Sequence, residues 1–185
     1  MISLSHKFIF VHVQKTGGNS ITRELLDYCE DVTVGDKTDG EKESISLALN
    51  DHNVTAEYKH YGIKEYSELL DISDFTTFKV WRPPHKRLPS LWQWGMGGMP
   101  KQDEVVERIK GVKSFLSYGP TDYTIDFNHL ESGLNEVLQT VGIPKVELGH
   151  YNSMGSYEIP DYITEAIYKE CEEEYKVMGN TELVC

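Results

Sequence analysis

Short apolar runs alternate with amphipathic stretches along this chain of 185 residues. Runs rich in β-branched and aromatic residues predict buried strands, and the foremost, at 8–13, is followed at once by an apolar stripe of helical spacing. Further strands are predicted at 54–60, 75–81, 121–127 and 146–148, and helices at 44–49, from 85 onward, and at 103–110, 130–141 and 161–178. This alternation predicts an α/β fold of three layers, α/β/α, with a mostly parallel central sheet.

Length and charge limit the possible classes of protein. A chain of 185 residues suits one domain covering 1–185, which can bury roughly 70% of the surface of its unfolded state, and no internal repeat divides it. The formal net charge of −12 argues against a general nucleic-acid binder, because such proteins need a basic face to neutralise phosphates. A local basic site for a small anion remains compatible with that charge.

Two features of the sequence bear on cellular location. Only seven residues precede the first predicted strand, so we expect no signal peptide, and no apolar run reaches the length of a membrane span. Cys29, Cys171 and Cys185 are an odd number at wide spacings, which is typical neither of a disulfide framework nor of a zinc site. We therefore expect a cytoplasmic protein with no membrane partner. The sequence carries no signal for the oligomeric state.

The turn after the first strand carries the strongest chemical signal. Residues 14–18 supply one cation, one hydroxyl and two glycines between strand and helix, and Asn19 or Ser20 is expected to cap the helix. Glycines let the backbone approach an oxyanion, helix N–H groups point at it, and Lys15 adds a full positive charge. The turn therefore predicts an anion cradle. The alternative is an ordinary strand–turn–helix with a solvated lysine.

The order K-T-G-G-N-S behind F-V-H-V resembles the 5′-phosphosulfate loop of sulfotransferases. The carbohydrate-type branch is the nearest in pattern, with loops that commonly read PKTGGTS or PKTAGTS; here Gln14 replaces the proline and Asn19 the threonine. The Walker A loop, GxxxxGK[ST], has its glycines before the lysine instead. The resemblance implies a P-loop-like loop that binds 3′-phosphoadenosine 5′-phosphosulfate through Lys15, Thr16, Gly17, Gly18, Asn19 and Ser20.

A second anion-binding pattern follows the strand at 75–81. Arg82 comes directly after the strand, and Ser90 lies eight positions further on, as in the family's 3′-phosphate motif RDPYERLVS. Pro83 replaces the usual aspartate, and Pro89 stands where a valine is usual, which a helix tolerates only near its start. A guanidinium can hold a phosphate through paired charge-assisted hydrogen bonds. The resemblance implies that Arg82 and Ser90 bind the cofactor's 3′-phosphate; the alternative is a surface ion pair.

The candidate base is His60, at the end of the strand predicted at 54–60. Open α/β sheets bind ligands at the carboxyl ends of their strands, and an imidazole suits removal of a proton from a hydroxyl near neutral pH. In the sulfotransferases that the chain resembles, a histidine after the second strand serves as general base, which implies that role for His60. The alternative is a surface loop histidine. His12, inside the first strand, is interpreted as mainly structural.

Two later stretches complete the expected site. Asn152 and Ser153 resemble the family's late N-x-S/T loop, which implies contact with the cofactor, although a plain turn, for which Asn, Ser and Gly are also suited, is the stronger interpretation. Trp92 and Trp94 point to different faces of a helix end, so one is expected in the core while the other is placed to line an acceptor pocket. The glycines that follow would permit a lid, and an ordinary linker is the alternative.

The resemblance implies a sulfotransferase that moves a sulfuryl group from 3′-phosphoadenosine 5′-phosphosulfate to a hydroxyl of a small molecule or carbohydrate. His60 would take the proton, Lys15 would stabilise the developing charge, and no metal is expected. A metal-dependent nucleotide or small-molecule kinase stays open, although such enzymes place a carboxylate at a strand end to hold Mg²⁺ and this strand ends in Trp81-Arg82. A nucleotide-binding module without catalysis is the other alternative.

Overall fold

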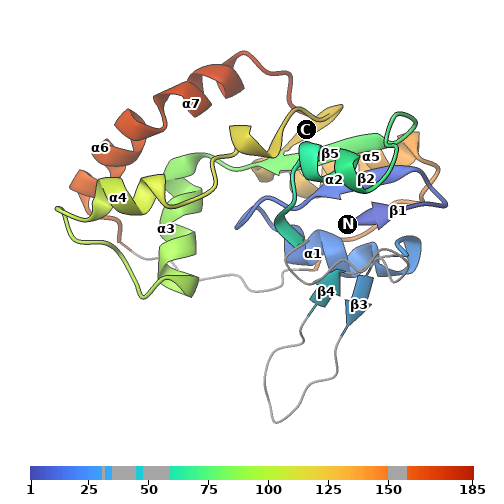
Figure 1. Ribbon diagram of the computed structural model, residues 1–185, viewed down its shortest axis with the longest axis horizontal. Coiled ribbons are helices and arrows are strands. Elements are labelled where there is room, and N and C mark those ends of the chain that lie inside the picture. The colour runs from blue at the N-terminus through green and yellow to red at the C-terminus, as the bar shows by residue number, and fades with distance from the viewer. Residues whose placement is uncertain (31, 35–44, 48–58, 150–157) are drawn as a thin grey trace, which may run out of the picture.

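The protein is an α/β structure organised on a four-stranded mixed sheet, as the computed structural model in Figure 1 shows. The structure describes residues 1–30, 32–34, 45–47, 59–149 and 158–185. The sheet has the order β1-β2-β5-β6, in which β1 runs antiparallel to β2 and the other two pairs are parallel. Its strands are β1 (Ile2–Ser3), β2 (Phe8–Val11), β5 (Thr76–Trp81) and β6 (Tyr123–Asp126).

Helices connect and cover these strands. The α-helices are α1 (Gly18–Glu24), α2 (Ile63–Leu69), α3 (Pro84–Gly95), α4 (Val105–Lys110), α5 (Leu130–Thr140), α6 (Asp161–Glu170) and α7 (Glu172–Gly179). Short 3-10 turns are η1 (Leu26–Tyr28), η4 (Leu116–Tyr118) and η5 (Phe127–His129). A separate antiparallel pair consists of β3 (Val32–Val34) and β4 (Ile45–Leu47).

The main hydrophobic core surrounds the sheet. All four residues of β2 are fully buried, as expected for a strand with helices on its faces. Helices contribute Ile21 and Leu25 from α1, and the stripe Leu134, Val137 and Leu138 from α5. The apolar stripes that predicted these two helices are therefore their buried faces.

A second hydrophobic cluster lies among three helices. It consists of Leu88 and Trp92 from α3, Val105 and Ile109 from α4, and Ile163 and Ile167 from α6. Figure 1 shows these helices grouped together on one side of the view, with the main sheet on the other. The expectation that one of the two neighbouring tryptophans is in the core is confirmed, since Trp92 is fully buried while Trp94 is 50% exposed.

Several predicted elements differ from the structure. Within the predicted helix 44–49, Ile45–Leu47 form strand β4. Of the predicted strand 54–60, residues 54–58 lie outside the described residues, and Lys59 and His60 form a 3-10 turn. Residues 146–148 form no strand, because the side chain of Asn135 takes up the backbone hydrogen bonds of Val146. Asn135 Oδ1 accepts from Val146 N at 2.8 Å, and Asn135 Nδ2 donates to Val146 O at 2.9 Å.

The predicted closing helix 161–178 is two helices that meet at Cys171. Cys171 has φ −106° and ψ 18°, outside helical geometry. Helix α6 packs Ile163 and Ile167 into the second cluster, whereas Met178 of α7 belongs to the main core. The break therefore lets consecutive helices face different clusters.

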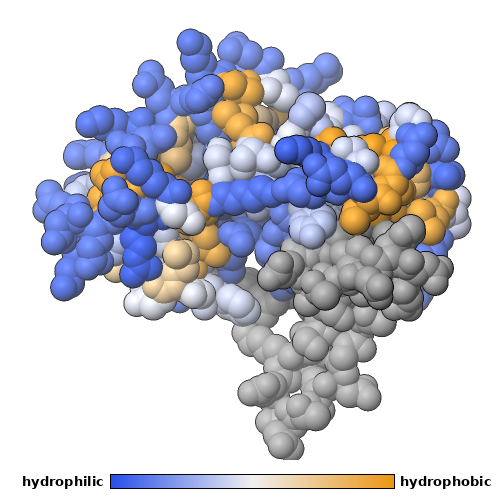
Figure 2. Space-filling model, in the orientation of Figure 1, coloured by the Kyte–Doolittle hydropathy of each residue, from blue (hydrophilic) through white to orange (hydrophobic). Residues whose placement is uncertain are grey.

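The outer surface is mainly polar. Figure 2 shows many hydrophilic residues, with apolar patches between them, on the described part of the face in view, in keeping with 30 acidic and 18 basic side chains. In the parts of the chain that the structure describes, none of the helices combines the length and the apolar character that crossing a membrane would require.

Candidate functional site

The candidate site lies where β2 and β5 end, side by side and parallel. After β2 the chain turns through Lys15, with φ 62°, and Gly17, with φ 82°, before α1 begins at Gly18. A left-handed lysine is uncommon and costs conformational energy, which the surrounding structure must offset. The expected caps Asn19 and Ser20 are wrong: the N-cap is Gly17, and no side chain caps the helix.

Gly18 is required by its close contact with a buried histidine. A Cβ added at Gly18 would lie 1.6 Å from Cδ2 and 1.8 Å from Nε2 of His12. The ring of His12 in turn stacks on His60, with centroids 4.9 Å apart and planes 19° apart. The turn, the end of β2 and the candidate base therefore pack as one unit.

We expect Gly18→Ala to lower the free energy of unfolding by about 1–3 kcal/mol, because the added methyl group overpacks the site. Urea unfolding measures this change. Gly179→Ala is the matched control, since a Cβ there meets nothing within 4 Å. Adding His12→Ala to Gly18→Ala should recover part of the loss. Unfolding of Gly18→Ala at the wild-type urea concentration would contradict the packing argument.

His60 is oriented and held neutral by its surroundings. Its Nδ1 donates to the carbonyl oxygen of His12 at 2.9 Å, which leaves the lone pair on Nε2. Burial lowers the pKa of His60, the bond to the His12 carbonyl opposes this, and the charges of Lys59 and Lys113 lower the pKa further. The imidazole is thus neutral at pH 7, the state that a general base needs.

Two lysines that the sequence patterns did not single out surround His60. Lys59 Nζ donates to Asn19 Oδ1 at 3.0 Å, and burial lowers the pKa of Lys59. Lys113 Nζ donates to the His60 carbonyl and to Glu65 Oε1, both at 3.2 Å. The signal that could have found Lys59 is its position, directly before the candidate base and therefore beside the turn. Lys113 is far away in sequence, and no local pattern marks it.

Arg82 is joined directly to the turn. Its Nη1 donates to the carbonyl oxygen of Lys15 at 2.9 Å, and its guanidinium carbon lies 4.5 Å from the ring centroid of Phe127. Lys15 Nζ lies 4.7 Å from the ring centroid of Trp94, so the exposed tryptophan borders the site. Three cationic side chains, from Lys15, Lys59 and Arg82, thus surround one short turn.

Other predicted cofactor-binding residues have their side chains engaged or buried. Thr16 is fully buried, and its Oγ1 donates to the Val13 carbonyl at 2.9 Å, so its hydroxyl is engaged within the turn. Ser20 and Ser90 are only 8% and 5% exposed. Pro89 lies inside α3, a full turn past the helix start. Asn152 and Ser153 lie outside the described residues.

Comparison with known proteins identified no similar protein. No protein-family model matches the chain, and searches of curated proteins and of solved structures returned no match either. The function must therefore be argued from the site itself.

Proposed function

We propose that the protein is a sulfotransferase that uses 3′-phosphoadenosine 5′-phosphosulfate and sulfates a hydroxyl acceptor. The observation that carries the proposal is the 2.9 Å bond from Arg82 to the Lys15 carbonyl. It joins the two stretches that resemble the 5′-phosphosulfate and 3′-phosphate motifs, at the carboxyl ends of adjacent parallel strands. A donor with anionic groups at both ends suits such a pair of neighbouring cationic sites.

In the proposed reaction the acceptor oxygen attacks sulfur in line with the departing 5′-phosphate oxygen. A new S–O bond forms, the S–O bond to the 5′-phosphate breaks, and Nε2 of His60 takes the hydroxyl proton. Lys15, Lys59 and the turn's backbone amides stabilise the charge that develops on the sulfuryl group and on the phosphate that leaves. Helix α1 has seven residues, so we assign most of the stabilisation to the lysines.

The proposal gives the turn at 12–18 a P-loop-like role in a three-layer α/β/α domain. Backbone N–H groups of the turn, that of Gly17 among them, would donate to the 5′-phosphosulfate. Arg82 would hold the 3′-phosphate through its guanidinium, over the ring of Phe127. Trp94, half exposed beside Lys15, would border the acceptor.

A metal-dependent kinase is the second candidate function, and one observation favours it. Asp126 ends β6 and pairs in register with Trp81, directly before Arg82. Kinases and NTPases use such a carboxylate to hold Mg²⁺ against phosphates. Although β5 itself ends in Trp81-Arg82, the neighbouring strand β6 supplies a carboxylate, so a kinase remains an alternative.

The test is calorimetric titration with 3′-phosphoadenosine 5′-phosphate and with AMP, which lacks the 3′-phosphate, in the absence of metal. We expect tighter binding of the first ligand, and we expect Arg82→Ala to weaken it by about 10–100-fold, the equivalent of a hydrogen bond to a charged group. Arg108→Ala is the matched control, because Arg108 Nη1 also donates to a backbone carbonyl, that of Met96 at 2.6 Å.

Equal affinity for the two nucleotides would contradict the proposal. Mg²⁺-dependent turnover of ATP would then favour the kinase. Where the first ligand binds as expected, incubation of the labelled sulfated donor with a panel of hydroxyl acceptors tests transfer. A non-catalytic nucleotide-binding module would be favoured if the protein bound the nucleotide tightly but sulfated no acceptor, and if His60→Asn bound the nucleotide with the same affinity.

A further inference from the structure

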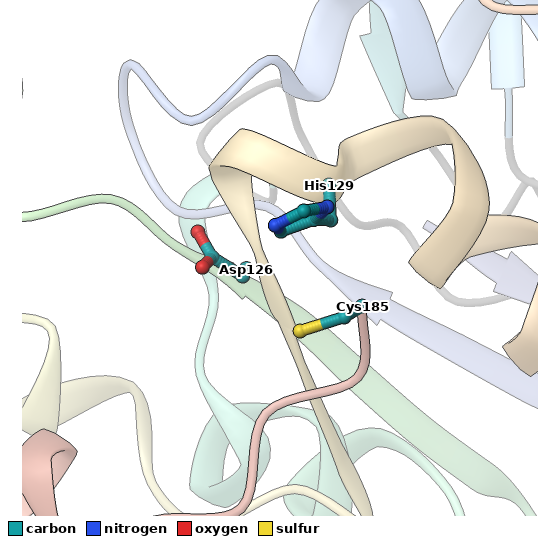
Figure 3. A group of neighbouring side chains, drawn as sticks. All are labelled: Asp126, His129 and Cys185. Carbon is teal, nitrogen blue, oxygen red and sulfur yellow. The ribbon is translucent and has the colours of Figure 1, made fainter.

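Three side chains with metal-binding chemistry meet beyond the end of β6. They are Asp126, His129 and Cys185, and their potential ligand atoms all lie within 4.8 Å of one another. Figure 3 shows the three side chains as neighbours that come from the end of β6, the turn before α5 and the C-terminal segment. Asp126 is half-buried, whereas His129 and Cys185 are exposed, so solvent can reach the space between them.

The backbone holds the cysteine beside the strand. Val184 N donates to Thr124 O at 3.0 Å, and Asp126 N donates to Val184 O at 3.1 Å, which places Cys185 next to the end of β6. Gly133 of α5 allows this close approach, since a Cβ there would lie 2.8 Å from the Val184 oxygen. The position of Cys185 is thus set by regular backbone pairing.

Asp126 and His129 are also fixed locally. Oδ1 of Asp126 accepts from both N and Nδ2 of Asn128 at 2.9 Å, which orients the carboxylate and leaves Oδ2 outside these two bonds. Hydrogen bonds of this kind to a ligating carboxylate tune metal sites. His129 ends the η5 turn three residues later and is the N-cap of α5. The two side chains therefore come from one short turn.

We propose that Asp126, His129 and Cys185 bind a zinc ion. One oxygen, one nitrogen and one sulfur ligand suit zinc, whereas Mg²⁺ and Ca²⁺ prefer oxygen ligands alone. In a tetrahedral zinc site the ligand atoms lie roughly 3.4–3.6 Å apart, so small side-chain rotations would close the present arrangement. The fourth position is left for water or another ligand. The Cys185 thiol loses its proton to solvent on binding.

The site would also act on its neighbours. Phe127, between the two ligands of the turn, lies under the guanidinium of Arg82 and close to Gly17. Zinc would hold this turn to the C-terminal segment and so restrict the movement of Phe127. The inference does not rest on the proposed function, because it uses neither nucleotide nor acceptor.

The test is titration of the untagged, chelator-treated full chain with Co²⁺, followed by displacement with Zn²⁺. We expect a thiolate-to-cobalt charge-transfer band that one equivalent of zinc abolishes, and we expect Cys185→Ser to lack it. His129→Gln and Asp126→Asn should weaken Co²⁺ binding by more than about 100-fold, beyond the loss usual for outer-shell changes. Cys29→Ser and Cys171→Ser are matched controls, because these two cysteines lie outside the group.

A charge-transfer band that survives in Cys185→Ser, or that disappears in Cys29→Ser, would overturn the proposal, as would the absence of a band in the wild type. Alkylation of Cys185 by iodoacetamide, followed by peptide mass mapping, gives a second readout. Zinc should slow this reaction at least about tenfold in the wild type and have no effect in His129→Gln, since the thiolate would be coordinated only in the former. Equal protection in both proteins would also overturn the proposal.

Discussion

Glu174→Gln is expected to lower the free energy of unfolding by about 3–5 kcal/mol, because it leaves a buried guanidinium without its counter-charge. The side chains of Arg87 and Glu174 are 2% and 4% exposed, and Arg87 Nη2 lies 3.4 Å from Oε2. The same carboxylate oxygen accepts from Ser114 Oγ and from Phe115 N, both at 3.3 Å. This ion pair links α7 to α3 and to the segment before η4. Urea unfolding measures the loss.

Two variants separate this effect from general damage to α7. Glu173→Gln removes an exposed charge one residue away and should change the unfolding free energy by no more than about 0.5 kcal/mol. Arg87→Met combined with Glu174→Leu should be closer to the wild type than Glu174→Gln, since it removes both buried charges. A loss in Glu174→Gln as small as that in Glu173→Gln would contradict the expectation.

A neighbouring lysine adds a pH dependence to the same measurement. Burial lowers the pKa of Lys79 to about 8, and the charge of Glu174 opposes this. Because the folded state then binds fewer protons than the unfolded state from about pH 8 up to the ordinary lysine pKa of about 10.4, stability should rise across that window. Glu174→Gln should extend the window to lower pH, and Lys79→Met should abolish it.

The second large effect is expected at the candidate base. His60→Asn should lower kcat by about 10²–10⁴, the usual contribution of general base catalysis, with the affinity for 3′-phosphoadenosine 5′-phosphate unchanged. Asparagine keeps an N–H near the position of Nδ1, so the bond to the His12 carbonyl can persist while the proton acceptor is lost. Turnover of the labelled donor with the best acceptor of the panel measures kcat.

His6→Asn is the control for this substitution. His6 Nδ1 also contacts a backbone carbonyl, that of Val141 at 3.2 Å, but His6 precedes β2 at the opposite end of the strand. Its replacement should leave kcat unchanged. Equal loss in both variants would show that the effect of His60→Asn is structural.

The pH profile of kcat/KM gives an independent check of the base. Activity should be present above the pKa of His60 and fall as pH drops through it, with that pKa below the usual 6.5 because of burial and nearby lysines. Lys113→Met removes one of these positive charges and should move the acid limb to higher pH. If the acid limb of the profile does not move in Lys113→Met, the limb reports the titration of a group other than His60.

The sequence predicted the parts of the fold that local patterns determine. The run at 8–13 and the stripe of α5 are buried as expected, because apolar periodicity reports directly which face is covered. Strand β1 has only two residues, too few for any periodicity. At 146–148 the apolar pattern is typical of a strand, but the side chain of Asn135 forms the hydrogen bonds that a neighbouring strand would need. Asn135 and Val146 are eleven positions apart, so no local pattern shows this contact.

Some parts of the candidate site could likewise be predicted from local patterns, and others could not. The turn with Lys15 and the position of Arg82 follow from strand ends, and adjacency of parallel strands brings them together. The stacking of His12 on His60 and the approach of Lys113 depend on long-range packing, so the sequence could not indicate them. Cys185 reaches Asp126 only because the C-terminal segment pairs with β6, which cysteine spacing alone cannot reveal.

The bond between Arg82 and the Lys15 carbonyl has a thermodynamic consequence. Because this bond and the contact with Phe127 already orient the guanidinium, a ligand meets a side chain whose rotamer freedom has been lost on folding. The conformational entropy of the Arg82 side chain is therefore lost when the domain folds, and little further entropy is lost when a ligand binds. A ligand's fit to the site is accordingly decided by shape and charge, with little adjustment of the protein around it.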